Sequence, residues 1–121
     1  MTENQNSKTY DLEERTFGFA NDVRLFLKKI PRTIGNIEDA IQLTRSSGSV
    51  GANYIEANEA LSRKDFILRV KICRKEAKES RYWLRLLDLG INVELQKERD
   101  RLFKEVTELM KIFGAIVTKS S

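Results

Sequence analysis

The chain contains no histidine, and this absence limits the chemistry that it can perform. Histidine is the usual general base at neutral pH and a frequent ligand of zinc and iron, so Ser/His and Cys/His nucleophile pairs and the common zinc and di-iron sites are excluded. The single cysteine, Cys73, cannot form an internal disulfide, which is typical of a reducing compartment. No apolar run reaches the ~18 residues of a transmembrane helix, and no signal-peptide pattern opens the chain. We therefore expect a cytoplasmic protein with no membrane partner.

Proline and glycine are also rare, with one proline and six glycines in 121 residues. The chain is 40% hydrophobic and 33% charged, which is enough apolar material for a core and argues against a disordered chain. Residues 1–9 are polar and show no apolar period, so we expect them to form a disordered N-terminal arm. A single domain over residues 10–119 accounts for the rest of the chain.

Apolar residues recur at alternating steps of four and three in four segments, which predicts four amphipathic helices. In the first segment the stripe ends before Pro31 and consists of Leu12, Thr16, Phe19, Val23, Phe26 and Ile30. In the third, which Ser62 caps and which ends before Gly90, it consists of Phe66, Val70, Cys73, Ala77, Ser80, Leu84 and Leu87. In the fourth, capped by Asn92, it consists of Leu95, Leu102, Val106, Leu109, Phe113 and Ile116. Short connections make this an all-α, antiparallel up-down-up-down four-helix bundle.

The second segment leaves two interpretations open. Its stripe keeps the helical period but is small in the middle, and it consists of Ile34, Ile37, Ile41, Thr44, Gly48, Gly51, Ile55 and Asn58. The helix breaks between Ser46 and Gly51, or it continues and the missing side chains let a neighbouring helix approach closely. The unbroken phase of the stripe favours one continuous helix.

Two stretches carry more apolar surface than one bundle seam needs. The fourth helix has a second stripe, and the end of the third is apolar on most sides. Either the core is wide, with Trp83 packed at one end, or these surfaces join copies of the chain. The predicted oligomer interface consists of Trp83, Leu86, Phe103, Met110 and Val117.

Charge is distributed unevenly along the chain, whose net charge is +4. Residues 62–89 hold nine basic residues against four acidic ones, whereas residues 33–61 hold one basic residue against four acidic ones. A row of cations at helical spacing suits the phosphates of a nucleic-acid backbone. The competing interpretation is that the row is a paired or solvated face, with Glu56, Glu59, Glu76 and Glu79 able to pair with it inside the bundle. The candidate nucleic-acid-binding residues are Arg74, Lys78, Arg81 and Arg85, with Lys71 and Lys75 as outer contributors.

Other candidate motifs give no comparable signal. The sequence from Gly48 to Gly51 matches the GxxG loop of KH domains, but that loop belongs to an α/β fold. The glutamate pairs are faintly similar to a di-metal bundle, but such sites use Glu-x-x-His and the chain has no histidine. Cys73 falls on the apolar seam and is interpreted as a core residue rather than a nucleophile. We expect no metal, no cofactor and no enzymatic activity.

The central stretch from Arg45 to Leu87 carries a resemblance to a known family. It begins RSSGSVGANYIEANEALS and ends ICRKEAKESRYWLRLL, and IPRTIGNIEDA precedes it from Ile30. Over roughly residues 10–118 the chain resembles the bacterial four-helix-bundle proteins of the 23S rRNA intervening-sequence family. The resemblance implies a homopentameric ring of antiparallel bundles and an unbroken second helix. It also relates the chain to the accessory variability proteins of diversity-generating retroelements, which bind nucleic acid and a reverse transcriptase.

Two functions are compatible with these observations. The first is a non-enzymatic oligomeric module that contacts an RNA or DNA backbone through the basic stripe of the third helix. The second is a scaffold whose ring docks a protein partner, such as a polymerase, without touching nucleic acid. The resemblance supplies no catalytic residues and no established biochemical activity.

Overall fold

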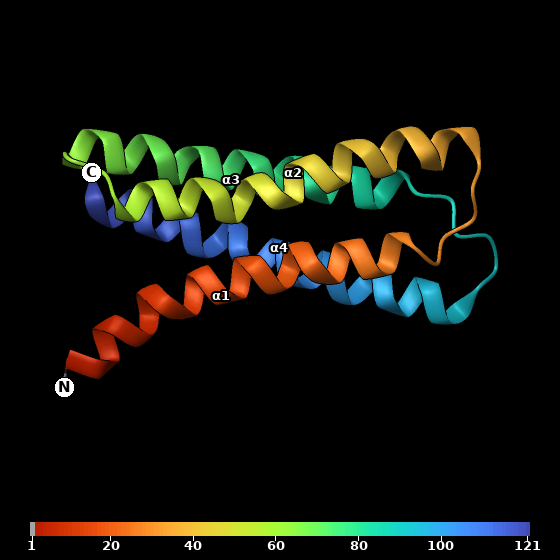
Figure 1. Cartoon of the computed structure of the whole chain (residues 1–121), viewed down its shortest axis with the longest axis horizontal. Helices are drawn as coiled ribbons and strands as arrows, with labels where there is room; N and C mark the ends of the chain where they lie inside the picture. The colour runs from red at the N-terminus through yellow and green to blue at the C-terminus, as the bar shows by residue number, and fades with distance from the viewer. Residues whose placement is uncertain (1) are drawn as a thin grey trace.

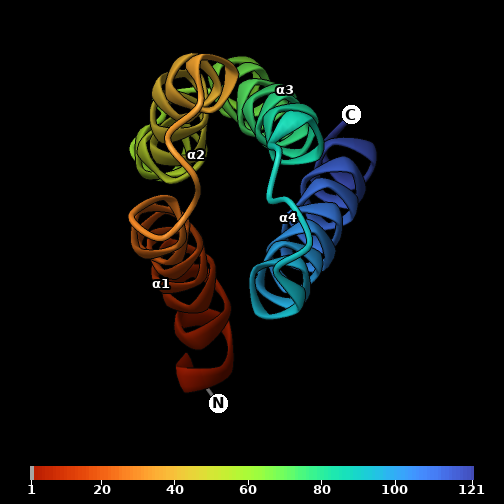
Figure 2. The same cartoon turned by 90° about the vertical axis from the view of Figure 1, so that its right-hand side faces the viewer.

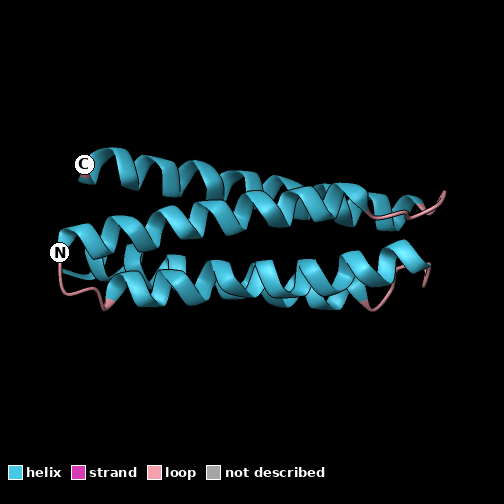
Figure 3. Cartoon of the chain, turned by 90° about the horizontal axis from the view of Figure 1, so that it is seen from above, coloured by secondary structure: helices cyan, strands magenta, loops and turns pink. Residues whose placement is uncertain are grey.

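Four helices make up almost all of the structure, a computed structural model that describes the backbone of residues 2–121 and the side chains from Leu12 onward. They are α1 (Thr2–Leu27), α2 (Ile34–Asn58), α3 (Arg63–Leu86) and α4 (Val93–Ser120). Each runs antiparallel to the one before it, and short turns connect them (Figures 1 and 3). This up-down-up-down bundle confirms the predicted fold class. The backbone of α1 begins at Thr2, but the side chains of the expected N-terminal arm lie outside the described residues, so its disorder stays a prediction.

Side-chain caps define where three of the helices begin. The Ser62 hydroxyl accepts a hydrogen bond from the Asp65 amide at 3.1 Å, as the sequence predicts for the start of α3. The Asn92 carbonyl oxygen accepts one from the Leu95 amide at 3.0 Å and starts α4 in the same way. Thr33 caps α2, accepting from the amide of Asn36 at 3.1 Å. Each cap satisfies an amide that has no partner within the helix.

The core lies along the axis that the four helices surround (Figure 2). The stripes predicted for α1, α3 and α4 face it, which confirms the phase of those three helices. Its largest fully buried apolar side chains are Phe19, Phe26, Phe113, Leu43, Leu84, Leu102 and Leu109. None of the helices that the structure describes is both long and apolar enough to cross a membrane.

The second helix is continuous, as expected, but the prediction of its buried face is wrong. The isoleucines assigned to the core are exposed, with exposed fractions of 85% for Ile34, 42% for Ile37, 54% for Ile41 and 50% for Ile55. The buried face instead consists of Asn36, Leu43, Ser46, Ser47, Val50, Tyr54 and Ala57. The helical period of α2 is therefore confirmed, but the predicted buried side of the helix is wrong.

Small and hydrogen-bonded residues explain why the other side of α2 is buried. The Ser80 hydroxyl of α3 donates to the Ser46 hydroxyl at 2.8 Å and lies 2.9 Å from the carbonyl oxygen of Glu76. A Cβ atom on Gly51 would lie 2.8 Å from Oγ1 of the buried Thr16 on α1. Isoleucine side chains could not fit at these contacts, because packed interiors leave no room for extra methylene groups.

The helix ends also differ slightly from the prediction. Helix α1 ends at Leu27, before the buried Ile30, and α3 ends at Leu86, although Gly90 has the left-handed φ of 63° expected after a helix. The chain leaves α3 early because the Asn36 side chain bonds both backbone groups of Asp88. Its amide nitrogen donates to the carbonyl oxygen at 2.7 Å, and its carbonyl oxygen accepts from the backbone amide at 2.9 Å. These two bonds replace the helical bonds that Asp88 gives up.

The contact between α1 and Gly51 gives a prediction about stability. We expect Gly51→Ala to lower the free energy of unfolding by about 1–3 kcal/mol, because the new methyl group has no room beside Thr16. Thr16 cannot easily move, since its hydroxyl lies 2.8 Å from the carbonyl oxygen of Leu12 and 3.0 Å from that of Glu13. Gly18→Ala is the matched control, since nothing lies within 4 Å of its added Cβ, and it should be neutral or stabilising by up to about 1 kcal/mol. Equal stabilities of the two variants in urea unfolding would contradict this packing.

Burial in the core raises the pKa of the Cys73 thiol to about 12. The folded protein should therefore not react with iodoacetamide at pH 8–9, whereas the unfolded chain should react at the ordinary rate, because only the thiolate is nucleophilic. An unfolded thiol loses its proton near pH 8.5, so the unfolded state binds fewer protons and stability should fall as pH rises from there towards 12. Mass spectrometry of alkylation measures the reactivity. Rapid labelling of the folded chain would place Cys73 outside the core.

Candidate nucleic-acid interface

Five of the six predicted basic residues of α3 are exposed, and two of the six, Arg74 and Arg81, reach the side of the helix that adjoins α4. Arg74 extends along α4, since a Cβ atom on Gly114 would lie 3.6 Å from its Nη1 atom. Arg81 is the half-buried member. Its Nη1 atom donates to the Thr107 hydroxyl at 3.4 Å, and its guanidinium lies 5.6 Å from the centre of the Phe103 ring. These contacts fix two cations at the α3–α4 edge.

Among residues 12–121, no ion pair joins a basic residue of α3 to a carboxylate. In the part of the chain with described side chains, three ion pairs are present, and all of them connect α4 with α1 or the turn after it. They join Arg15 to Glu105 at 2.8 Å, Lys29 to Glu98 at 2.9 Å and Arg101 to Asp22 at 3.3 Å. The interpretation that the glutamates form ion pairs with the row is therefore wrong for residues 12–121, whereas a solvated row agrees with the exposure of its side chains.

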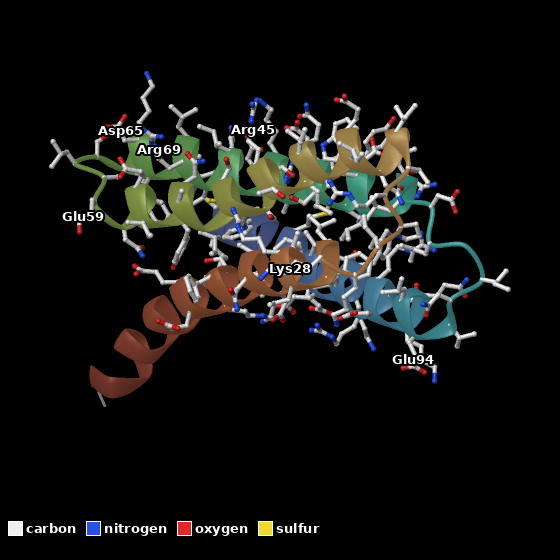
Figure 4. All side chains as sticks on the ribbon, turned by 45° about the vertical axis from the view of Figure 1, so that its right-hand side comes forward. Lys28, Arg45, Glu59, Asp65, Arg69 and Glu94 are labelled. Carbon is white, nitrogen blue, oxygen red and sulfur yellow. The ribbon has the colours of Figure 1, made fainter. Side chains whose placement is uncertain are left out.

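The glutamates of α3 lie towards α2 instead. Burial raises the pKa of Glu76, the neighbouring Glu79 raises it further, and Lys75 and Arg45 of α2 partly offset this. Arg69 of α3 (Figure 4) is on the same side, and its Nη1 atom donates to the side-chain oxygen Oδ1 of Asn53 on α2 at 3.2 Å. The two glutamates in the middle of α3 thus lie towards α2 together with Arg69, and Arg74 and Arg81 lie towards α4.

Two lysines of α4 that were not predicted from the sequence extend the basic surface. Lys104 and Lys111 are both exposed and lie three residues before and four residues after Thr107, which contacts Arg81. This spacing places them on the side of α4 next to α3. The sequence contained a signal for them, because each lysine directly follows a residue of the second apolar stripe of α4, Phe103 or Met110. We refer to Lys71, Arg74, Lys75, Lys78, Arg81, Arg85, Lys104 and Lys111 together as the basic face.

The predicted oligomer interface does not form one surface. Phe103, Met110 and Val117 share one side of α4, next to the basic face, where all three are half-buried. Trp83 instead lies two turns after Glu76, towards α2, and packs against the core. Leu86, at the end of α3, is 48% exposed. The structure therefore separates Trp83 from the three residues of α4, and their role in assembly stays a prediction.

A broad apolar surface lies on the opposite edge of the bundle, along α1 and α2. It includes a groove of about 320 Å³ between the two helices, lined by Phe17, Ala20, Ala52 and Ile55 among others. Phe17 is 67% exposed, so the surface presents an aromatic ring to solvent as well as aliphatic side chains. We call it the apolar face and define it by Phe17, Leu25, Ile34, Ile37, Ile41 and Ile55.

The weaker motifs have ordinary structural explanations. Gly48 and Gly51 lie inside a helix and contact Arg24 and Thr16 of α1, so they do not form a nucleotide-binding loop. Within the described residues, no three cysteine, aspartate or glutamate side chains are grouped closely enough to hold a metal ion.

Comparisons with known proteins agree with this geometry. A model of the 23S rRNA-intervening sequence protein family matches residues 8–115. A crystal structure from Bacteroides thetaiotaomicron, described as a protein with unknown function from the S23 ribosomal protein family, is 32% identical in sequence. It superposes with a TM-score of 0.70, over 87% of this chain and 96% of that one. No curated protein matches the chain.

The family model covers almost all of the bundle, including the continuous α2 and the basic α3. The chain belongs to the 23S rRNA-intervening sequence protein family.

Proposed function

We propose that the protein is a non-enzymatic oligomeric module that binds the sugar-phosphate backbone of RNA or DNA through its basic face. The observation that carries the proposal is that the cations of α3 form no ion pair with a carboxylate among residues 12–121, whereas α4 forms three ion pairs with α1 and the turn after it. Unpaired cations at helical spacing are available to phosphates, and the counterions that they displace supply the free energy of binding.

The dimensions of the face suit a backbone rather than a single anion. Arg74 and Arg85 are separated by about 16 Å along α3 at 1.5 Å per residue, which spans several phosphates. Lys104 and Lys111 widen the face onto α4. An oligomer repeats this surface in each subunit, so that modest contacts add up to high avidity.

Charge reversal within the basic face tests the proposal. We expect Arg74→Glu/Lys78→Glu to weaken binding of a labelled oligonucleotide and to reduce the slope of log affinity against log salt by about two, one for each lost phosphate contact. Arg81 is left unchanged because it packs on Phe103. Fluorescence anisotropy across a salt series measures the slope, and light scattering verifies that the assembly is unchanged.

The matched control is Lys28→Glu/Arg32→Glu, which changes the net charge equally at exposed positions in the turn region after α1. Its affinity and salt slope should stay close to those of the unchanged protein. Equal losses in the two double variants would show a general charge effect. The absence of binding by the unchanged oligomer at low salt would rule out the function itself.

The apolar face is the surface that we assign to self-association within this proposal. Six large apolar side chains with exposed fractions from 42% to 85% lie along α1 and α2, and exposed apolar surface of this extent is typical of an interface. A second copy of the chain is always available as a partner, so self-association can keep this face buried. The pentamer remains what the family resemblance implies.

Polar substitutions on this face test the assembly. We expect Ile37→Asp/Ile41→Asp to lower the mass measured by light scattering, because buried carboxylates without partners oppose association. Both isoleucines are exposed in the single chain, so circular dichroism and the unfolding midpoint should change little. The control is Leu68→Asp, at a 55% exposed position of α3. If the double variant keeps its full mass, the face is free for another protein, and the scaffold function is favoured instead.

A further inference from the structure

Tyr82 is an exposed aromatic residue among the cations of the basic face. Its exposed fraction is 53%. It follows Lys78 by four residues and precedes Arg85 by three, so the three side chains share one side of α3. The ring meets that of Trp83 edge-on, with centroids 5.0 Å apart and planes at 75°. Because Trp83 packs against the core, this contact holds the tyrosine ring in a defined position.

The other aromatic residues of the described side chains do not offer the same surface. Arg81 lies over the ring of Phe103, 5.6 Å from its centre. Tyr54 is buried, and Phe17 belongs to the apolar face on the other edge of the bundle. Tyr82 is therefore the aromatic group, within residues 12–121, that is open to solvent with cations beside it. Glu79, three residues before it, is the one carboxylate of α3 at the same spacing.

We propose that the basic face binds single-stranded nucleic acid in preference to a duplex, with one base stacked on Tyr82 and the adjoining phosphates on Lys78 and Arg85. This inference rests on the proposed function, since it concerns the same face. In a duplex the bases are paired and stacked, and a side chain on the convex surface of a helix cannot reach their rings. A single strand can turn its bases outward onto an aromatic side chain, whatever their identity, while cations hold its backbone.

Three oligonucleotides of equal length separate the contribution of bases from that of phosphates. They are a single strand, the same sequence as a duplex, and an abasic strand that keeps the phosphates and lacks the bases. The unchanged protein should bind the base-containing strand most tightly. Tyr82→Ala should lower its affinity for that strand by about five-fold to a hundred-fold, and for the abasic strand and the duplex by less than about two-fold.

Two variants control for the loss of the ring. Tyr82→Phe retains the stacking surface and should bind all three oligonucleotides like the unchanged protein. Leu68→Ala removes an apolar side chain of the same helix that is 55% exposed and should also leave the single-strand preference intact. Light scattering verifies that each variant has the mass of the unchanged oligomer.

The outcomes distinguish this inference from the proposed function. Equal binding of all three oligonucleotides, or an equal loss on the abasic strand in Tyr82→Ala, would overturn single-strand selection and leave backbone binding in place. A failure to bind any of the three at low salt would overturn both. A loss confined to the base-containing strand, restored in Tyr82→Phe, supports the stacking role of Tyr82.

Discussion

The close approach of α2 to its two neighbours is the constraint on which the rest of the structure depends. Gly51 meets Thr16 of α1, and Ser46 meets Ser80 of α3, where two hydroxyl groups lie 2.8 Å apart. Because small residues occupy this side of α2, its isoleucines must face outward. The apolar face is thus a consequence of how α2 packs. The hydroxyl pair is fully satisfied, so burying it carries no penalty for an unpaired donor.

The distribution of ion pairs follows from the same packing. Helices α1 and α4 lie farther apart than the other neighbouring helices (Figure 2), and long charged side chains span the space between them. Glu98 and Glu105 of α4 are both used in these pairs. Partly exposed pairs of this kind are each worth roughly 0–1 kcal/mol. Their larger effect is on charge, because these carboxylates are turned to the side of α4 away from the cations of α3.

The fold could be predicted from the sequence because its signals are local. The apolar period, the caps at Ser62 and Asn92 and the phase of three helices depend only on neighbouring residues. The buried side of α2 could not be predicted, since isoleucine is the stronger apolar signal and the Ser46–Ser80 contact joins residues far apart in the chain. The basic stripe was found from spacing alone. That it forms no ion pair with residues 12–121 could not be predicted, because this depends on the side of each helix on which the carboxylates lie. To assign Lys104 and Lys111 to the basic face, one must know which side of α4 packs against α3.

The placement of the two surfaces bears on whether one protein can use both. Helices α1 and α2, which carry the apolar face, form one edge of the bundle, and α3 and α4, which carry the basic face, form the opposite edge (Figure 2). Assembly through the first would leave the second uncovered, whereas an interface built from Phe103, Met110 and Val117 would bring like charges of two subunits together beside Arg81. Repulsion between unpaired cations in a low-dielectric interface is costly, and it opposes that second arrangement. An oligomer that joins its apolar faces therefore concentrates positive charge on its outer surface, which is the distribution that a polyanion requires.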